Sequence, residues 1–267
     1  MPRVAVPLYP GTNSEDETLR ALLAVGLDAE LVHWSRGARA LRAFDAFVVP
    51  GGFAYEDRVR AGAVAAHDEL TDAIVDGAQA GKLVVGICNG AQILLETGLV
   101  PGYGSIRRPT AAFTPNADGG RYLCTHAYVK LVVDPARLPV LAGLPSASVI
   151  PMWVSHGEGR LQAAPDELAR LEADGHVAFV YCDAAGNRIA APNGSALDAA
   201  ALTNVAGNVL ALMPHPERDA WTFMQRDGAV RSAARGDAAA MLAPSGGMQL
   251  FHAFAQAVNA HSGAVSW

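Results

Sequence analysis

Residues 83–92 could position a reactive cysteine. The first half of this stretch is rich in Val and Ile and predicts a buried strand, and Gly86, Cys88 and Gly90 then follow the spacing of a nucleophile elbow with cysteine in place of serine. The flanking glycines let neighbouring backbone approach a cramped turn without a Cβ clash. The helix expected next favours negative charge at Cys88, in the thiolate and in a developing oxyanion. The alternative is a small cysteine buried between strand and helix.

A cysteine nucleophile needs a base and a group that orients the base. Among the eight histidines, His215 has the best context, because Met213-Pro-His-Pro-Glu-Arg218 follows a predicted buried strand. Pro216 favours extended backbone at His215, so Glu217 is expected on the same side of the chain, within reach of the imidazole. A rigid proline-rich turn in which His215 and Glu217 only cap a helix is the alternative.

His156 is a second candidate base, since Glu158 also stands two residues after it. It is expected in a flexible glycine loop, Ser155-His-Gly-Glu-Gly159, with no stiff strand behind it. We therefore expect His156 to contact a substrate or a partner rather than to act as the base.

An acyl-transfer site also requires donors for the oxyanion. Pro50-Gly-Gly-Phe53 follows a predicted parallel strand, at the sheet edge where ligands of open α/β sheets bind. We expect the backbone N–H groups of Gly52 and Asn89 to form this pair. Gln92, one helical turn after Cys88, could hold a polar substrate. A plain glycine turn and an exposed helix glutamine are the alternatives.

Length and composition restrict the class of protein. The 267 residues fit one large α/β domain or two small ones, and the chain shows no internal repeat or low-complexity linker, so a single domain over residues 1–267 is favoured. The 51% hydrophobic content excludes a disordered chain, and the net charge of −6 argues against a general nucleic-acid binder. The start of the chain lacks the apolar stretch of a signal peptide, and no run approaches the length of a membrane span.

The three cysteines are an odd number without metal-ligand spacing, so neither a disulfide framework nor a metal site is expected. Cys124 and Cys182 are expected to pack in the core. The sequence contains neither a Walker A motif nor G-x-G-x-x-G, so we expect no cofactor in this chain. These features predict a soluble, cytoplasmic protein.

Short β-branched runs alternate with helical stretches, which predicts a flavodoxin-like, open and mostly parallel sheet with helices on both faces. Ser14 and Glu17 form a predicted capping box for the first helix, which Gly26 ends. The other expected elements are strands at 3–7, 29–34, 46–50, 83–87 and 208–213, helices at about 62–80, 90–97, 165–173 and 248–260, and a small antiparallel extension from 122–133, 148–154 and 176–182. An Ala-rich, partly exposed insertion is expected within about 221–244.

The motifs Pro50-Gly-Gly-Phe53, Gly86-Ile-Cys-Asn-Gly90 and Pro214-His-Pro-Glu-Arg218, in this order, resemble those of class I (triad) glutamine amidotransferases. With Pro10-Gly-Thr-Asn13, His156-Gly-Glu-Gly159 and Pro192-Asn-Gly-Ser195, the wider pattern is most similar to the glutaminase (purQ-type) subunits of phosphoribosylformylglycinamidine synthase. The resemblance spans about residues 3–218 and resumes near 246–258.

This resemblance implies a Cys-His-Glu triad made of Cys88, His215 and Glu217, an oxyanion hole at Gly52 and Asn89, and substrate contacts at Gly51 and Gln92. It implies that glutamine is hydrolysed to glutamate and ammonia. The ammonia would pass to a large synthetase (purL-type) subunit that uses ATP and Mg, in a complex with a small accessory (purS-type) subunit.

The chain departs from the pattern at Glu56, where a small residue is usual, at Ser155, where alanine is common, and in the insertion near 221–244. Two other functions are compatible with part of the pattern. One is the glutaminase of a different amidotransferase, which the loops around His156 and Asn193 disfavour. The other is a non-catalytic flavodoxin-like regulatory binder with a reactive cysteine, which would have no need for a His-Pro-Glu motif on a separate strand.

Overall fold

The computed structural model describes residues 1–225 and 238–264. Its main feature is a nine-stranded sheet in the order β2-β1-β3-β4-β11-β10-β9-β6-β7. The strands of this sheet are β1 (Arg3–Leu8), β2 (Asp28–His33), β3 (Ala46–Val49), β4 (Leu83–Ile87), β6 (Leu123–Leu131), β7 (Val149–His156), β9 (Val177–Cys182), β10 (Ala199–Thr203) and β11 (Val209–Leu212). A separate antiparallel pair joins β5 (Ala111–Pro115) and β8 (Glu158–Ala163).

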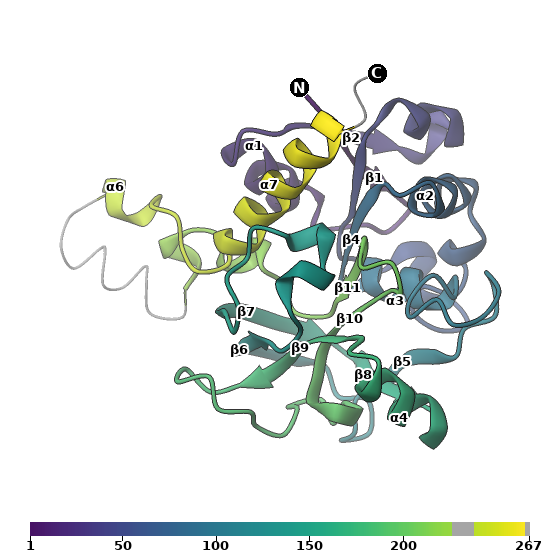
Figure 1. Cartoon of the computed structure of the whole chain (residues 1–267), viewed down its shortest axis with the longest axis vertical. Helices are drawn as coiled ribbons and strands as arrows, with labels where there is room; N and C mark the ends of the chain where they lie inside the picture. The colour runs from purple at the N-terminus through teal and green to yellow at the C-terminus, as the bar shows by residue number, and fades with distance from the viewer. Residues whose placement is uncertain (226–237, 265–267) are drawn as a thin grey trace.

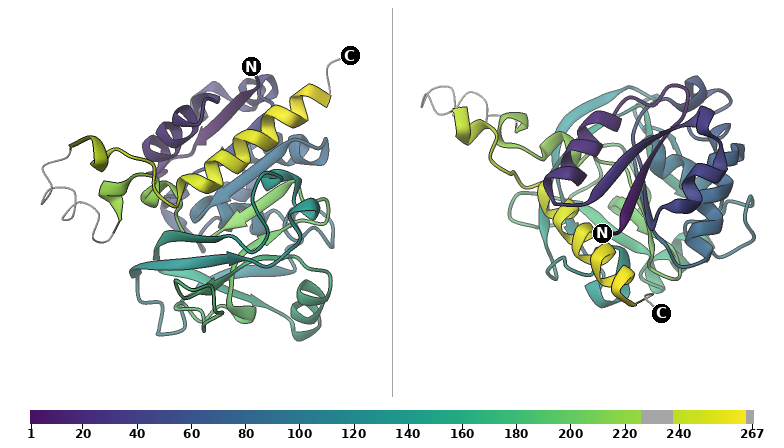
Figure 2. Two further views of the ribbon diagram at one scale, coloured as in Figure 1. Left: turned by 60° about the vertical axis from the view of Figure 1, so that its left-hand side comes forward. Right: turned by 90° about the horizontal axis from the view of Figure 1, so that it is seen from above.

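The helices are α1 (Glu15–Ala24), α2 (Glu69–Gln79), α3 (Asn89–Glu96), α4 (Pro165–Ala173), α6 (Ala238–Met241) and α7 (Met248–Ala264). Viewed from above, α1 and α7 lie on one face of the parallel part of the sheet and α2 lies on the other (Figure 2). No helix in the described part of the chain has both the length and the apolar composition that crossing a bilayer requires.

The predicted mostly parallel, helix-covered sheet is confirmed for the half of the sheet formed by β2, β1, β3, β4 and β11 (Figure 1). The antiparallel part is larger than expected, because β10, β9, β6 and β7 all join the same sheet. Strands β5, β8 and β10 were not predicted. Runs rich in Ala and Gly, such as those of β8 and β10, carry little of the β-branched signal that marks a strand.

Two local predictions at helix starts were wrong. The Ser14 side chain does not cap α1, because its hydroxyl donates to Asn13 Oδ1 and accepts from Arg218. The helix predicted from residue 62 begins only at Glu69. Asp68 adopts extended backbone there and accepts from the N–H of Leu70 at 2.7 Å, so it is the N-cap.

Residues 226–237, most of the predicted insertion, lie outside the described residues. The described parts of the insertion are a short 3₁₀ turn, Thr222–Met224, and α6.

The register of the parallel strands places three loops at one sheet edge. Val49 of β3 pairs with Gly86 of β4, and Ile87 of β4 pairs with Leu212 of β11. All of β3, β4 and β11 is buried, so these strands form a rigid base. The residues that follow the strands therefore meet at the carboxyl edge of the sheet, where open α/β sheets bind their ligands.

Candidate active site

Cys88 stands on a strained turn between β4 and α3. Its backbone has φ 51° and ψ −106°, a conformation that non-glycine residues rarely adopt. A Cβ on Gly90 would lie 2.1 Å from the carbonyl oxygen of Val49, and one on Gly86 would lie 2.7 Å from the carbonyl carbon of Gly90. Only glycine fits at either position, so the predicted elbow geometry is confirmed.

His215 and Glu217 form a buried pair. Nδ1 of His215 lies 2.5 Å from Oε1 of Glu217, and the side chains are 1% and 0% exposed. The contact was predicted, but the reason given for it was wrong. Pro216 has helical φ and ψ angles, and Glu217 begins a short 3₁₀ turn, Glu217–Asp219. The turn folds the carboxylate back onto the imidazole, while the N–H of His215 donates to the carbonyl of Trp153 in β7 at 2.7 Å.

Cys88 and His215 face each other across Gly51. A Cβ built on Gly51 would lie 2.8 Å from Cε1 of His215 and 3.4 Å from Cβ of Cys88. Nε2 of His215 is buried and has no hydrogen-bond partner within the described residues. Burial alone would lower the pKa of His215, but the carboxylate of Glu217 and the sulfur of Cys88 together outweigh it and raise the pKa. The imidazole is thus placed to hold a proton beside the sulfur.

Gly51 sets the space between nucleophile and base. In Gly51→Ala the new methyl group would push the imidazole away from the sulfur, and misplacement by about 1 Å costs on the order of 10²-fold in rate. For the glutamine hydrolysis that the motifs imply, we expect kcat to fall by that order, measured as glutamate release. Gly104→Ala is the matched control, because a Cβ there meets nothing closer than 3.5 Å. Equal activities of the two variants would contradict this account of Gly51.

No hydrogen bond between the described residues uses the N–H group of Gly52 or that of Asn89. Gly52 forms an isolated β-bridge with Thr12. The two hydrogen bonds of this bridge run between neighbouring residues, from the N–H of Asn13 to the carbonyl of Gly51 and from the N–H of Phe53 to the carbonyl of Gly11. Asn89 is the first residue of α3, and the N–H of a first helical residue has no acceptor within the helix. The two donors remain our proposal for the oxyanion hole.

Gln92 lines a cavity that opens beside Cys88, but both the nitrogen and the oxygen of its amide are hydrogen-bonded to other residues of the protein. Nε2 donates to the carbonyl of Glu158 at 2.5 Å, and Oε1 accepts from Nδ2 of Asn89 at 2.9 Å. Asn89 in turn accepts from the N–H of Ala54 and donates to Asp57. Gln92 therefore connects α3 to the loops around it, and its contact with glutamine stays a prediction.

His156 does not lie in a flexible loop, as the sequence analysis expected. It ends β7, paired with Leu123 of β6, and β8 starts two residues later. His156 is 3% exposed, and neither ring nitrogen has a hydrogen-bond partner among the residues that the structure describes. The carboxylate of Glu158 accepts from the N–H of Ala61 instead. Burial and the nearby His215 lower the pKa of His156 to about 3, so the ring is neutral.

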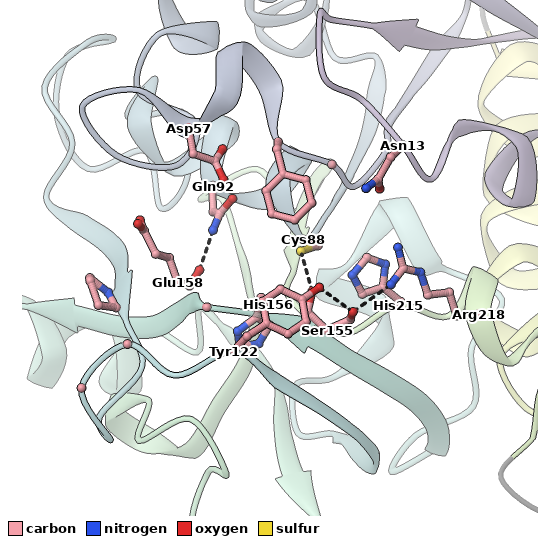
Figure 3. A pocket seen from close by; sticks show the side chains of 16 residues that line it. Asn13, Asp57, Cys88, Gln92, Tyr122, Ser155, His156, Glu158, His215 and Arg218 are labelled. Carbon is pink, nitrogen blue, oxygen red and sulfur yellow. Dashed lines mark hydrogen bonds between the residues drawn. The ribbon is translucent and has the colours of Figure 1, made fainter.

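A cavity of about 380 Å³ opens beside Cys88 and is lined by His156, His215 and several residues that the sequence analysis did not single out (Figure 3). On one side the guanidinium of Arg218 donates to the hydroxyls of Ser155 and Ser14, both at 2.9 Å, and Ser155 also bonds to Tyr122 at 2.8 Å. The carbonyl of Ser155 lies 3.8 Å from Sγ of Cys88. Arg218 directly follows His215-Pro-Glu217 in the sequence. This position was the one sequence feature that could have identified it as a residue of the site.

The residues that the structure describes contain no group of three or more His, Cys, Asp or Glu side chains arranged to hold a metal ion. The chemistry available at this site is that of a cysteine with a carboxylate-oriented histidine, which suits acyl transfer.

Comparison with known proteins agrees with this site. Residues 1–255 match the family model of the CobB/CobQ-like glutamine amidotransferase domain, so the fold and the site define a glutamine amidotransferase. The chain is 44% identical over 219 residues to the phosphoribosylformylglycinamidine synthase subunit PurQ of Symbiobacterium thermophilum, covering 81% of this chain and 87% of that protein. It is 40% identical over 216 residues to the PurQ subunit of Thermus thermophilus, covering 81% and 89%. The chain therefore belongs to the PurQ family of glutamine amidotransferases.

A solved structure with a similar fold is that of PurLQS from Thermotoga maritima. One of its chains superposes with a TM-score of 0.72 at 27% identity, covering 96% of this chain and 98% of that one. The predicted fold and family are thus confirmed over nearly the whole chain.

Proposed function

We propose that this chain is the glutaminase subunit of a phosphoribosylformylglycinamidine synthase and supplies ammonia for purine biosynthesis. The observation that carries the proposal is the buried His215–Glu217 pair facing Cys88 at the rim of the cavity. The names and the coverage of the relatives support the choice of synthase.

In the proposed reaction His215 takes the thiol proton of Cys88, and the sulfur attacks the side-chain carbonyl carbon of glutamine. The resulting oxyanion accepts hydrogen bonds from the N–H groups of Gly52 and Asn89. Collapse of the tetrahedral intermediate breaks the C–N bond, and His215 gives its proton to the nitrogen, which leaves as ammonia. Water, deprotonated by His215, then cleaves the thioester to glutamate and regenerates the thiol of Cys88.

The partners of the proposed complex are a large PurL-type synthetase subunit and a small PurS-type subunit, as in the PurLQS assembly of the similar structure. ATP and Mg would act on the large subunit, and this chain would need no cofactor. We further propose that the chain is one amidotransferase domain and works in the cytoplasm.

Reconstitution tests the proposal. The chain is mixed with PurL-type and PurS-type subunits, ATP, Mg and formylglycinamide ribonucleotide, and the amidine product is measured with glutamine or with ammonium as nitrogen donor. Glutamine-dependent synthesis should require this chain, whereas ammonium-dependent synthesis should not. Glutamine-dependent synthesis that is equally fast without the chain would overturn the proposal.

A further inference from the structure

A second pair of carboxylate and imidazole lies behind the pair that faces Cys88. The carboxylate of Asp219 is completely buried, and its Oδ2 lies 2.6 Å from Nε2 of His126 on β6. Its Oδ1 accepts from the hydroxyl of Ser245 at 2.5 Å. These three residues do not line the cavity beside Cys88, so a ligand in that cavity would not contact them. They can affect the reaction only through the residues of the site.

Asp219 belongs to the same short turn as Glu217. The 3₁₀ turn runs from Glu217 to Asp219, and the N–H of Asp219 donates to the carbonyl of Pro216 at 3.0 Å. A single 3₁₀ turn has poor hydrogen-bond geometry of its own, so contacts from outside must hold it. Both carboxylate oxygens of Asp219 make such contacts, and its carbonyl accepts from the N–H of Gly247 at 2.9 Å. Asp219 therefore anchors the far end of the turn that carries Glu217.

Residues 245–247, which follow the predicted insertion, pack directly on this turn. The hydroxyl of Ser245 also accepts from Nε2 of Gln225 at 2.7 Å, so it joins the two sides of the insertion. A Cβ on Gly247 would lie 2.2 Å from the carbonyl oxygen of Pro216, which shows how closely the two backbones approach. A shift of this segment would therefore move the turn as well.

His126 connects Asp219 to the imidazole of the site by a second route. The ring of His126 packs edge-on against that of Trp153, with 5.4 Å between the ring centroids and 79° between the planes. Trp153 in turn exchanges two backbone hydrogen bonds with His215. The His126–Asp219 bond thus closes a ring of contacts that includes both His215 and Glu217.

We propose that Asp219 is a positioning residue, which with Ser245 and His126 holds the turn at which Glu217 meets His215. The inference rests on the proposed function, because it gives Asp219 a part in the hydrolysis of glutamine. Nδ1 of His215 and Oε1 of Glu217 are 2.5 Å apart, so a small displacement of the turn would weaken their contact. A buried carboxylate often adds less to stability than an apolar side chain of the same size, so its use here favours a role in orientation.

The test uses Asp219→Ala in the reconstituted complex. Misplacement by about 1 Å costs on the order of 10²-fold in rate, so kcat for glutamine hydrolysis should fall by that order while KM changes little. Ser245→Ala, which removes one donor and keeps the carboxylate, should lower kcat by about tenfold, the size of one charged hydrogen bond. Asp198→Ala is the matched control and should leave kcat unchanged. Asp198 also ends a 3₁₀ turn and accepts from Arg188 and Ala191, but its turn carries no residue of the site.

A double variant shows whether Asp219 acts through Glu217. In a Glu217→Gln background, Asp219→Ala should lower kcat by no more than about twofold, because the carboxylate that Asp219 positions is already gone. A change that only loosened the fold would reduce kcat by the same factor in both backgrounds. The measurement is glutamate release by the four members of this cycle.

The pH profile gives a second readout of positioning. Glu217 contributes to the raised pKa of His215, so its displacement in Asp219→Ala should lower that pKa. The fall in kcat on the basic side should then move toward neutral pH, whereas a loosened fold would lower kcat equally at every pH. The titratable and charged groups that face His215 are Cys88 from the elbow, His156 from β7, and Glu217 and Arg218 from its own turn.

A wild-type kcat in Asp219→Ala would overturn the positioning role. The same factor of loss in both backgrounds, with an unshifted pH profile, would overturn it too. If Asp219→Ala does not fold, the same measurements on Ser245→Ala decide the question. Failure of the wild-type complex to hydrolyse glutamine at all would instead contradict the proposed function.

Discussion

Replacing Cys88 with alanine should abolish glutamine-dependent synthesis in the reconstituted complex while leaving ammonium-dependent synthesis intact. The sulfur is the only group at the elbow that can form the thioester, and loss of a covalent nucleophile costs at least about 10³-fold. Ammonium bypasses this site, because it can reach the synthetase without being released from glutamine. The measurement is the rate of amidine formation with each nitrogen donor.

Cys124→Ala is the control for this variant. The prediction that Cys124 packs in the core was wrong, because this side chain points out of β6 and is an exposed free cysteine, whereas Cys182 is buried as expected. Removal of Cys124 should therefore leave both rates unchanged. Equal loss of both activities in Cys88→Ala would show that the residue supports the complex rather than the release of ammonia.

The parts of the site that could be predicted from the sequence are those whose residues lie close together along the chain. Gly86, Cys88 and Gly90 lie within one strand–turn–helix unit, so their spacing alone specifies the crowded elbow. His215 and Glu217 are two residues apart, and nearly any tight conformation of this proline-flanked segment brings them together. That is why the pair was identified correctly although its backbone is turned rather than extended.

The other wall of the cavity depends on contacts between segments far apart in the chain. The carbonyl of Ser155 reaches Cys88 only because β7 runs antiparallel to β6 and Trp153 bridges to His215. Asp57 enters the cavity through a left-handed turn that Asn89 holds, and no local signal in Tyr55-Glu-Asp57 indicates such a turn. The position of these side chains follows from tertiary structure, which residue spacing does not encode.

The departure at Ser155 gains a physical explanation from the structure. Its hydroxyl joins Arg218 to Tyr122, a link that an alanine at this position could not make. Nε of Arg218 also lies 3.9 Å from Oε1 of Glu217, so this hydroxyl helps to hold a positive charge near the buried carboxylate of Glu217. No contact in the described residues gives Glu56 a comparable role, since its carboxylate meets only the exposed Arg58.

Replacing Glu217 with glutamine should lower kcat for glutamine hydrolysis by about 10⁴-fold, the cost of the equivalent change in another triad. The amide is close in shape to the carboxylate but cannot stabilise the imidazolium. Because Glu217 contributes to the raised pKa of His215, its neutralisation should lower that pKa. The imidazole of His215 would then lose its proton at a lower pH than in the wild type. In a plot of kcat against pH, the fall in kcat on the basic side should therefore move toward neutral pH.

The pH profile separates this electrostatic role from a packing role. Glu217 is fully buried, so a variant that only loosened the fold would lower Tm and reduce kcat equally at every pH. The decisive measurement is therefore glutamate release across the pH range, beside the thermal unfolding of the same variant. A kcat within about threefold of the wild type would refute the assignment, since it would mean that the imidazole keeps its charge without the carboxylate.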